Sequence, residues 1–188
     1  MLDVKKVLDF WFQGISDTTK IEKRKPPFSF WFRSSKDFDQ KIRDAFERDY
    51  LNLREGNQQE QIQSPQDALA AIIVLDQFSR NMYRNSTRMY ESDELALNLA
   101  IKTIDQGFDQ KLQLIERVFA YTPFMHAEDK NMQERHVQLI EQLVDESKEK
   151  CPDNTWYYEY TLRYAWKYLA TIKEFGRFPH RDKVLNRN

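Results

Sequence analysis

Apolar residues recur every three or four positions along most of the chain, which is the period of one face of an α-helix. We find no segment with the apolar and polar alternation of a half-buried β-strand. The pattern therefore predicts an all-α protein. We expect helices over about residues 3–13, from near Ser35, from Ser64 to about Tyr83, from Ser92 to Gly107, over residues 112–119 with an end before Pro123, and as a final pair that contains residues 139–144 and 156–175.

Glycine and proline residues separate these periodic stretches. Each of the four glycines follows the last turn of an expected helix, where a left-handed backbone is common. The six prolines lie between the expected helices, since proline interrupts a helix interior. We expect two of the intervening segments, an aromatic one at residues 28–32 and a polar one at 57–61, to be loops. The glycines are Gly14, Gly56, Gly107 and Gly176, and the prolines are Pro26, Pro27, Pro65, Pro123, Pro152 and Pro179.

The length of 188 residues fits a single all-α domain over residues 1–188. A chain of this size buries roughly 70% of its extended surface on folding, so a sizeable core is available. Short connections favour antiparallel helix hairpins stacked on one another. A clean repeat of roughly 34 residues is not visible, and any repeat architecture is therefore degenerate.

Composition and charge narrow the class of protein. The net charge is −1, from 29 basic and 30 acidic residues, which argues against a surface that grips nucleic acid. The longest apolar run, residues 68–75, is far too short to span a bilayer, and the N-terminal residues lack the apolar stretch of a secretory signal. The single cysteine, Cys151, allows no intramolecular disulfide. We expect a cytoplasmic protein with no membrane association.

The first of three polar and aromatic segments covers residues 76–84. Asp76 projects from the apolar stripe of the expected central helix, and Arg80 and Arg84 follow it at steps of four on the same side. A carboxylate placed there needs a partner. One interpretation is a half-buried pair of Asp76 and Arg80 that fixes helix packing. The other is an arginine-lined pocket for an anion, because two arginines and Asn81 exceed what one aspartate can neutralise.

The second segment covers residues 121–129. His126 precedes a helix in an aromatic loop, so it is either a structural histidine or a proton carrier for a ligand. The helix dipole explains Glu128 and Asp129 as acids of a first helical turn. His136 is expected on a solvated helix face. These residues lack the spacing of two metal ligands on one helical face, so we expect no metal and no cofactor.

The third segment covers residues 175–181. Gly176 ends the last long helix, and Pro179 is expected to keep the following chain extended. Arg177, His180 and Arg181 either form a C-terminal clasp that pairs with surface acids or add a second basic wall to the pocket of Arg80. In both cases Phe175 and Phe178 would anchor the segment to the body of the protein. The sequence of this segment is compatible with both the clasp and the second basic wall.

These segments, in this order and spacing, resemble a bacterial family of uncharacterised all-α proteins, the domain of unknown function nine hundred and twenty-four. The resemblance begins at residues 7–12 (Val-Leu-Asp-Phe-Trp-Phe), continues through Trp31 and Phe32, and ends with residues 175–181. It implies a superhelix of helix pairs like that of tetratricopeptide-repeat proteins, and it implies no activity. Three residues depart from the family pattern: Ser79 for a proline, Ala127 for a serine and Tyr168 for a histidine.

Two functions remain as hypotheses. The first is a binding or interaction module, because stacked helix pairs form concave surfaces that hold peptides or protein partners. The alternative is a small enzyme or ligand-binding protein for an anionic metabolite. In it, arginines hold the anion, Asn81 orients it, and His126 or His180 moves a proton. An enzyme requires the three segments to meet at one pocket, whereas an interaction module would show closed pairs of arginine and carboxylate along an open groove.

Overall fold

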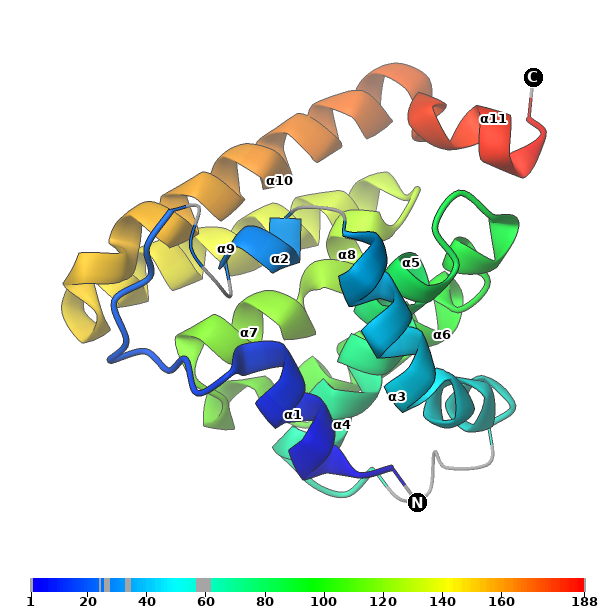
Figure 1. The fold of residues 1–188 in the computed structure, drawn as a ribbon. Coiled ribbons are helices and arrows are strands. Elements are labelled where there is room, and N and C mark those ends of the chain that lie inside the picture. Colours follow the sequence, from blue (N-terminus) through cyan, green and yellow to red (C-terminus); the bar gives the residue numbers. More distant parts are fainter. Residues whose placement is uncertain (1, 24, 26–27, 33–34, 57–61, 188) are drawn as a thin grey trace.

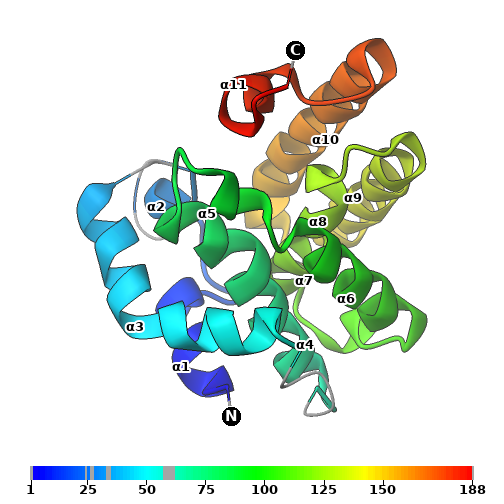
Figure 2. The ribbon, with the colours of Figure 1, turned by 90° about the vertical axis from the view of Figure 1, so that its right-hand side faces the viewer.

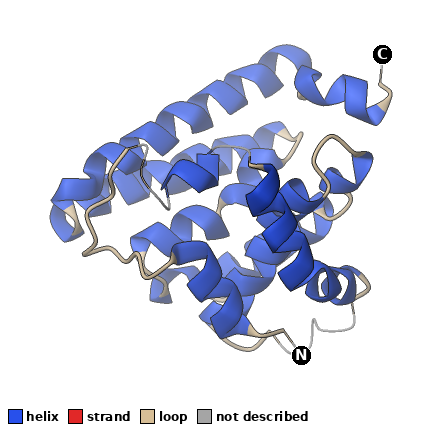
Figure 3. Cartoon of the chain, viewed as in Figure 1, coloured by secondary structure: helices blue, strands red, loops and turns tan. Residues whose placement is uncertain are grey.

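The computed structural model describes residues 2–23, 25, 28–32, 35–56 and 62–187. Within these ranges the chain forms helices and no strand, so the predicted all-α class is confirmed (Figure 3). The α-helices are α1 (Val4–Phe12), α2 (Phe28–Phe32), α3 (Lys36–Arg54), α4 (Pro65–Ile72), α5 (Ser79–Met82), α6 (Asp93–Asp105), α7 (Leu114–Ala120), α8 (Thr122–His126), α9 (Lys130–Lys150), α10 (Thr155–Phe175) and α11 (Asp182–Leu185). A π-helix covers Ile73–Phe78, and short 3₁₀ helices cover Thr87–Tyr90, Asp109–Lys111, Pro152–Asn154 and Pro179–Arg181.

The long helices α9 and α10 form an antiparallel pair along one side of the molecule (Figure 1). The helices from α1 to α8 lie beneath this pair, and the C-terminal helix α11 lies above α5 (Figure 2). One large apolar core runs from α1 to the start of α10, and a smaller cluster of Val137, Ala165 and Leu169 joins α9 to α10. The α9 and α10 pair matches the expected hairpin geometry. Stacking of such pairs into a tetratricopeptide-like superhelix stays a prediction.

The predicted central helix is confirmed at its start and in its burial. Ser64 and Asp67 form a reciprocal capping box with Pro65 in the first turn, and residues 68–75 are buried. The helix does not continue regularly to Tyr83, however, because residues 73–78 form a π-helix. The wider turn changes the angular step between residues beyond Ile72, so positions 76, 80 and 84 do not follow the regular α-helical steps assumed from the sequence.

Side chains from other positions bind the carbonyl groups of the π-helix. The Ser92 hydroxyl donates to the Leu75 carbonyl at 2.7 Å. The Asp76 carbonyl accepts from Arg80 Nη1 at 2.7 Å and from the Ser79 hydroxyl at 3.1 Å. These bonds satisfy buried backbone groups. They also explain why Ser92, which directly precedes α6, forms no capping bond with its side chain.

This arrangement predicts that replacement by aspartate is tolerated at Ser64 but destabilises the protein at Ser92. Ser92→Asp should lower the free energy of unfolding by about 1–3 kcal/mol, because a buried carboxylate cannot donate to the Leu75 carbonyl. Aspartate is a good N-cap, so Ser64→Asp, the matched control, should change stability little. Urea unfolding of both variants measures the difference. Equal stability of the two variants would contradict the role of Ser92 in holding the π-helix.

Three expectations about loops are corrected. Residues 28–32 form the short helix α2 rather than a loop. Pro123 lies in the first turn of α8, where the missing N–H is tolerated, rather than in a connection. Pro179 begins a 3₁₀ turn instead of keeping the chain extended. The expected polar loop at 57–61 lies outside the described residues.

The C-terminal segment is attached through one ring rather than two. Gly176 has a φ of 67° and ends α10 in the left-handed conformation, as predicted. Phe178 is then 1% exposed, whereas Phe175 is 49% exposed. Phe178 is therefore the apolar anchor, and the prediction that Phe175 shares this role is wrong.

Among the described residues, we find no helix with the length and apolar character needed to cross a bilayer.

Candidate functional site

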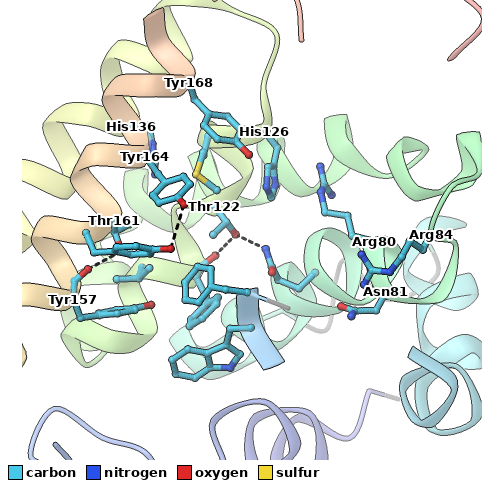
Figure 4. A pocket seen from close by; sticks show the side chains of 17 residues that line it. Arg80, Asn81, Arg84, Thr122, His126, His136, Tyr157, Thr161, Tyr164 and Tyr168 are labelled. Atoms are coloured by element: carbon cyan, nitrogen blue, oxygen red, sulfur yellow. Dashed lines mark hydrogen bonds between the residues drawn. The ribbon is translucent and has the colours of Figure 1, made fainter. Parts of the chain in front are cut away.

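A cavity of about 310 Å³ lies between α10 and the end of the central helix. Figure 4 shows the tyrosines of α10 on one side, and Arg80, Asn81 and Arg84 on the other. The polar lining consists of Gln77, Arg80, Asn81, Arg84, Thr122, His126, His136 and Thr161, and the apolar and aromatic lining consists of Trp31, Phe32, Val118, Phe119, Met125, Tyr157, Tyr160, Tyr164 and Tyr168. The cavity is therefore polar at one end and aromatic at the other.

Asp76 is fully buried behind the polar end. Its carboxylate accepts hydrogen bonds from Gln77 Nε2 at 2.6 Å, Thr122 Oγ1 at 2.8 Å and His126 Nδ1 at 2.7 Å. Arg80 Nη1 lies 3.2 Å from the same carboxylate. Burial alone would raise the pKa of Asp76, but His126, Arg80 and the Thr122 hydroxyl hold that pKa well below its usual range. Asp76 is a carboxylate at neutral pH.

Arg80 connects Asp76 to a second, half-buried acid. Its Nη2 lies 2.8 Å from Asp93, which is the first residue of α6. Arg181 of the C-terminal segment reaches the same carboxylate at 3.2 Å and also donates to the His126 carbonyl at 2.9 Å. Two arginines and two aspartates thus form a network without net charge, since each guanidinium faces a carboxylate.

His126, at the end of α8, lies between this network and the cavity. Burial lowers its pKa, and the charge of Arg80 lowers it further, although Asp76 acts in the opposite direction. The imidazole is therefore neutral at pH 7. Because the Asp76 carboxylate can only accept, Nδ1 carries the proton, and Nε2 keeps its lone pair. Nε2 forms no hydrogen bond with the described residues.

Arg84 lines the cavity but does not pair with Asp76, the carboxylate that its spacing offered as a partner. Its Nε and Nη2 instead donate to the Asp39 carboxylate at 2.7 and 3.0 Å, and Asn81 donates to Asp39 at 2.7 Å. Asp39 lies in the first turn of α3, far from these residues in the sequence. Arg84 and Asn81 therefore belong to the rim of the cavity, where their polar groups already have a partner.

The third polar and aromatic segment, residues 175–181, contributes one side chain to the site, and its other polar side chains lie nearer the surface. Arg181 is buried beside His126, with the rings of Tyr90 and Phe178 each 4.6 Å from its guanidinium carbon. Arg177 pairs with Asp182 of α11, and His180 is exposed. Only Arg181 of the three predicted residues therefore reaches the buried network.

The acids before α9 have separate roles. Glu128 accepts from the Phe178 backbone N–H at 2.8 Å and pairs with Arg187 at 2.5 Å, so it fastens the C-terminal segment. Asp129 is the N-cap of α9 and accepts from the Met132 backbone N–H. The prediction that both acids lie inside the first helical turn was one residue off, because α9 begins at Lys130.

His136 was predicted to be solvated, and it is buried. Only 1% of its surface is exposed, and its ring lines the cavity from α9. Burial lowers the pKa of His136 to about 3, so the ring is neutral. The prediction failed because α10 covers this face of α9, which the local sequence of α9 does not reveal.

Sequence reasoning also missed the aromatic wall and two acids. Tyr157, Tyr160, Tyr164 and Tyr168 recur at steps of three or four, so their spacing already placed them on one face of a helix. Asp39 and Asp93 resembled ordinary acids of a first helical turn, and no local signal marks their arginine partners. In the part of the chain that the structure describes, no three histidine, cysteine or acidic side chains come together as a metal-binding group.

The fold and the cavity define an all-α protein in which a buried network of aspartate, arginine and histidine borders an aromatic cavity. The sequence pattern of a family of bacterial proteins of unknown function, DUF924, matches residues 7–188, and the chain belongs to this family. Among solved structures, the chain is similar to a protein of unknown function from Agrobacterium tumefaciens, with 29% sequence identity and a TM-score of 0.80. The match covers 98% of this chain and 90% of that one. No curated protein matches the chain.

Proposed function

We propose that this protein binds a small organic molecule in the cavity and that His126 accepts a proton from it. The observation that carries the proposal is the hydrogen bond from His126 Nδ1 to the buried Asp76 carboxylate, while Nε2 forms no hydrogen bond within the described part of the chain. A carboxylate in this position orients the imidazole and stabilises the imidazolium that forms when Nε2 takes up a proton. The ligand-binding alternative raised by the sequence is therefore better supported than a purely structural cluster.

The charge balance argues for a different ligand from the anionic metabolite of the alternative hypothesis. Arg80 and Arg181 contact Asp93, and Arg84 contacts Asp39. An anion would have to compete with these carboxylates for the same guanidinium groups. The aromatic side chains that form the rest of the lining favour a ring or another apolar body. A neutral molecule with a polar end fits both features.

Interaction with a protein or peptide is the second candidate. The closed pairs of arginine and carboxylate are the pattern expected of such a module. Large side chains on α10 that remain exposed, Tyr164, Trp166 and Phe175, would supply its apolar contacts. This candidate does not explain the buried His126 and Asp76 pair, so we rank it below the ligand-binding function.

A phenol whose absorption band responds to hydrogen bonding tests the proposed contact with His126. We expect 4-nitrophenol to bind with its hydroxyl donating to Nε2, and its absorption band to shift on binding, because the lowered pKa of His126 leaves the proton on the phenol at equilibrium. His126→Asn keeps a side-chain N–H close to the position of Nδ1 but lacks Nε2. It should weaken binding about tenfold, which corresponds to about 1.4 kcal/mol. Absorbance titration of both proteins measures the two effects.

His180→Asn is the matched control, because His180 is exposed and lies outside the cavity lining. This variant should bind 4-nitrophenol as the unmodified protein does. Equal binding by His126→Asn, or no binding of 4-nitrophenol to the unmodified protein at millimolar concentration, would overturn the proposed function.

A further inference from the structure

His136 is the one cavity-lining histidine whose position the Asp76 network does not explain. It is 1% exposed, and its Nδ1 is buried with no hydrogen-bond partner in the portion of the chain that the structure describes. Neither ring nitrogen forms a hydrogen bond with a described residue. A buried polar group without a partner costs free energy that an apolar side chain of similar size would not. A purely structural reason for a histidine at this position is therefore missing.

The tautomer of His136 is opposite to that of His126. A neutral imidazole has one N–H donor and one acceptor nitrogen. Because an orphaned buried N–H is rarer than an orphaned acceptor, the buried Nδ1 is best assigned as the bare nitrogen, and Nε2 then carries the proton. In His126 the Asp76 carboxylate imposes the reverse, with the proton on Nδ1. One imidazole therefore accepts a hydrogen bond at the cavity, and the other donates one.

We infer that His136 is a second ligand-binding residue and that the ligand is a neutral aromatic molecule with a hydroxyl donor for His126 and a carbonyl-type acceptor for His136. The inference deepens the proposed function and rests on it. A cavity of about 310 Å³ is at the lower end of the range for ligand pockets, so it suits a ring with one or two small substituents. Tyrosines 157, 160, 164 and 168 provide the surface against which the ring packs.

The three isomers of hydroxybenzaldehyde are suitable probes, because each joins a hydroxyl donor and a carbonyl acceptor on one ring at a different spacing. Phenol has the donor alone, and benzaldehyde has the acceptor alone. His136→Leu removes the imidazole donor, and His136→Gln retains an N–H donor on a side chain of similar length. Isothermal titration of the full-length protein with each probe measures dissociation constants for the three proteins.

We expect at least one isomer of hydroxybenzaldehyde to bind the unmodified protein more tightly than either single-group probe. His136→Leu should weaken this binding and that of benzaldehyde about three- to tenfold, the range of one net hydrogen bond. Phenol should change by less than about twofold, since His126 is intact. His136→Gln should recover most of the lost affinity.

If the best isomer binds the unmodified protein and His136→Leu equally well, the inference is overturned. The imidazole of His136 would then bind an ordered water molecule or serve only in packing. Failure of all three isomers to bind at millimolar concentration would overturn the ligand class. If 4-nitrophenol still binds in a manner that depends on His126, the proposed function stands without the role of His136. The two failures are therefore distinguishable.

Thermal unfolding of His136→Leu distinguishes a ligand-binding histidine from a structural one, because the two roles predict opposite changes in the melting temperature. His136→Leu should keep or raise the melting temperature at neutral pH, because it removes a buried polar group without a partner. A histidine needed for packing would lower it. A large fall in the melting temperature of His136→Leu would therefore count against a ligand-binding role.

Discussion

Replacement of Asp76 by alanine should lower the free energy of unfolding by about 3–5 kcal/mol, the usual result of removing one partner from a buried ion pair. The carboxylate is fully buried, and Arg80, His126, Thr122 and Gln77 all direct polar groups at it. Without it these donors lose their acceptor in a site that water reaches poorly. Unfolding in urea, followed by circular dichroism, measures the loss.

Asp145→Ala is the matched control. Asp145 also forms an ion pair with a basic side chain, Lys148, but both groups are exposed. Its removal should leave the stability nearly unchanged, because water screens such pairs. Asp76→Asn covers the case in which the alanine variant does not fold, since it keeps the shape of the carboxylate but loses the charge. Stability of the asparagine variant equal to that of the unmodified protein would contradict the buried network.

Acid should destabilise the protein through His136, and His136→Leu should remove this part of the effect. The folded-state pKa is about 3, below the value of about 6.5 for an unfolded chain. Between these values the unfolded state binds a proton that the folded state does not, so stability falls as the pH falls. For this histidine the loss from pH 6 to pH 4 should be about 2.5 kcal/mol, with a limiting slope of about 1.4 kcal/mol per pH unit.

The measurement is a series of urea unfolding curves between pH 4 and pH 7. Each urea curve gives a free energy of unfolding, which is then plotted against pH. Near neutral pH the plots for the unmodified protein and for His136→Leu should have similar slopes, and at lower pH the unmodified protein should lose stability more steeply. His126, whose pKa is also lowered, lines the same cavity as His136 and adds a loss of the same sign in both proteins. The control is His180→Gln at the exposed histidine, which should retain the steep acid dependence. Parallel curves for the unmodified protein and His136→Leu would contradict the buried neutral imidazole.

Part of the site followed from local spacing. Asp76 and Arg80 are four residues apart, and they form an ion pair although a π-helix replaces the expected α-helix between them. His126 was singled out because a histidine among aromatic residues precedes a helix, and it lies at the polar end of the cavity. Whether these residues carry a function stays a proposal.

The remaining partners lie too far apart in the chain for local reasoning. Arg84 is 45 residues from Asp39, and Arg181 is 88 residues from Asp93. Sequence spacing defines neighbours only within one or two helical turns, since beyond that distance the packing of helices decides which faces meet. Asp39 and Asp93 therefore resembled ordinary acids of a first helical turn, because only the folded structure places arginines beside them.

Local sequence patterns were enough to predict the helical class, the central helix that contains residues 68–75, its start at Ser64 and the end of α10 at Gly176. These features depend on the period of apolar residues and on local backbone chemistry, which a short segment contains in full. The folded structure was needed to show that His136 is buried, that residues 73–78 form a π-helix, and that tyrosines of α10 line the same cavity as His126. Each of these depends on contacts between segments distant in the chain, and helix packing creates such contacts only when the whole molecule folds.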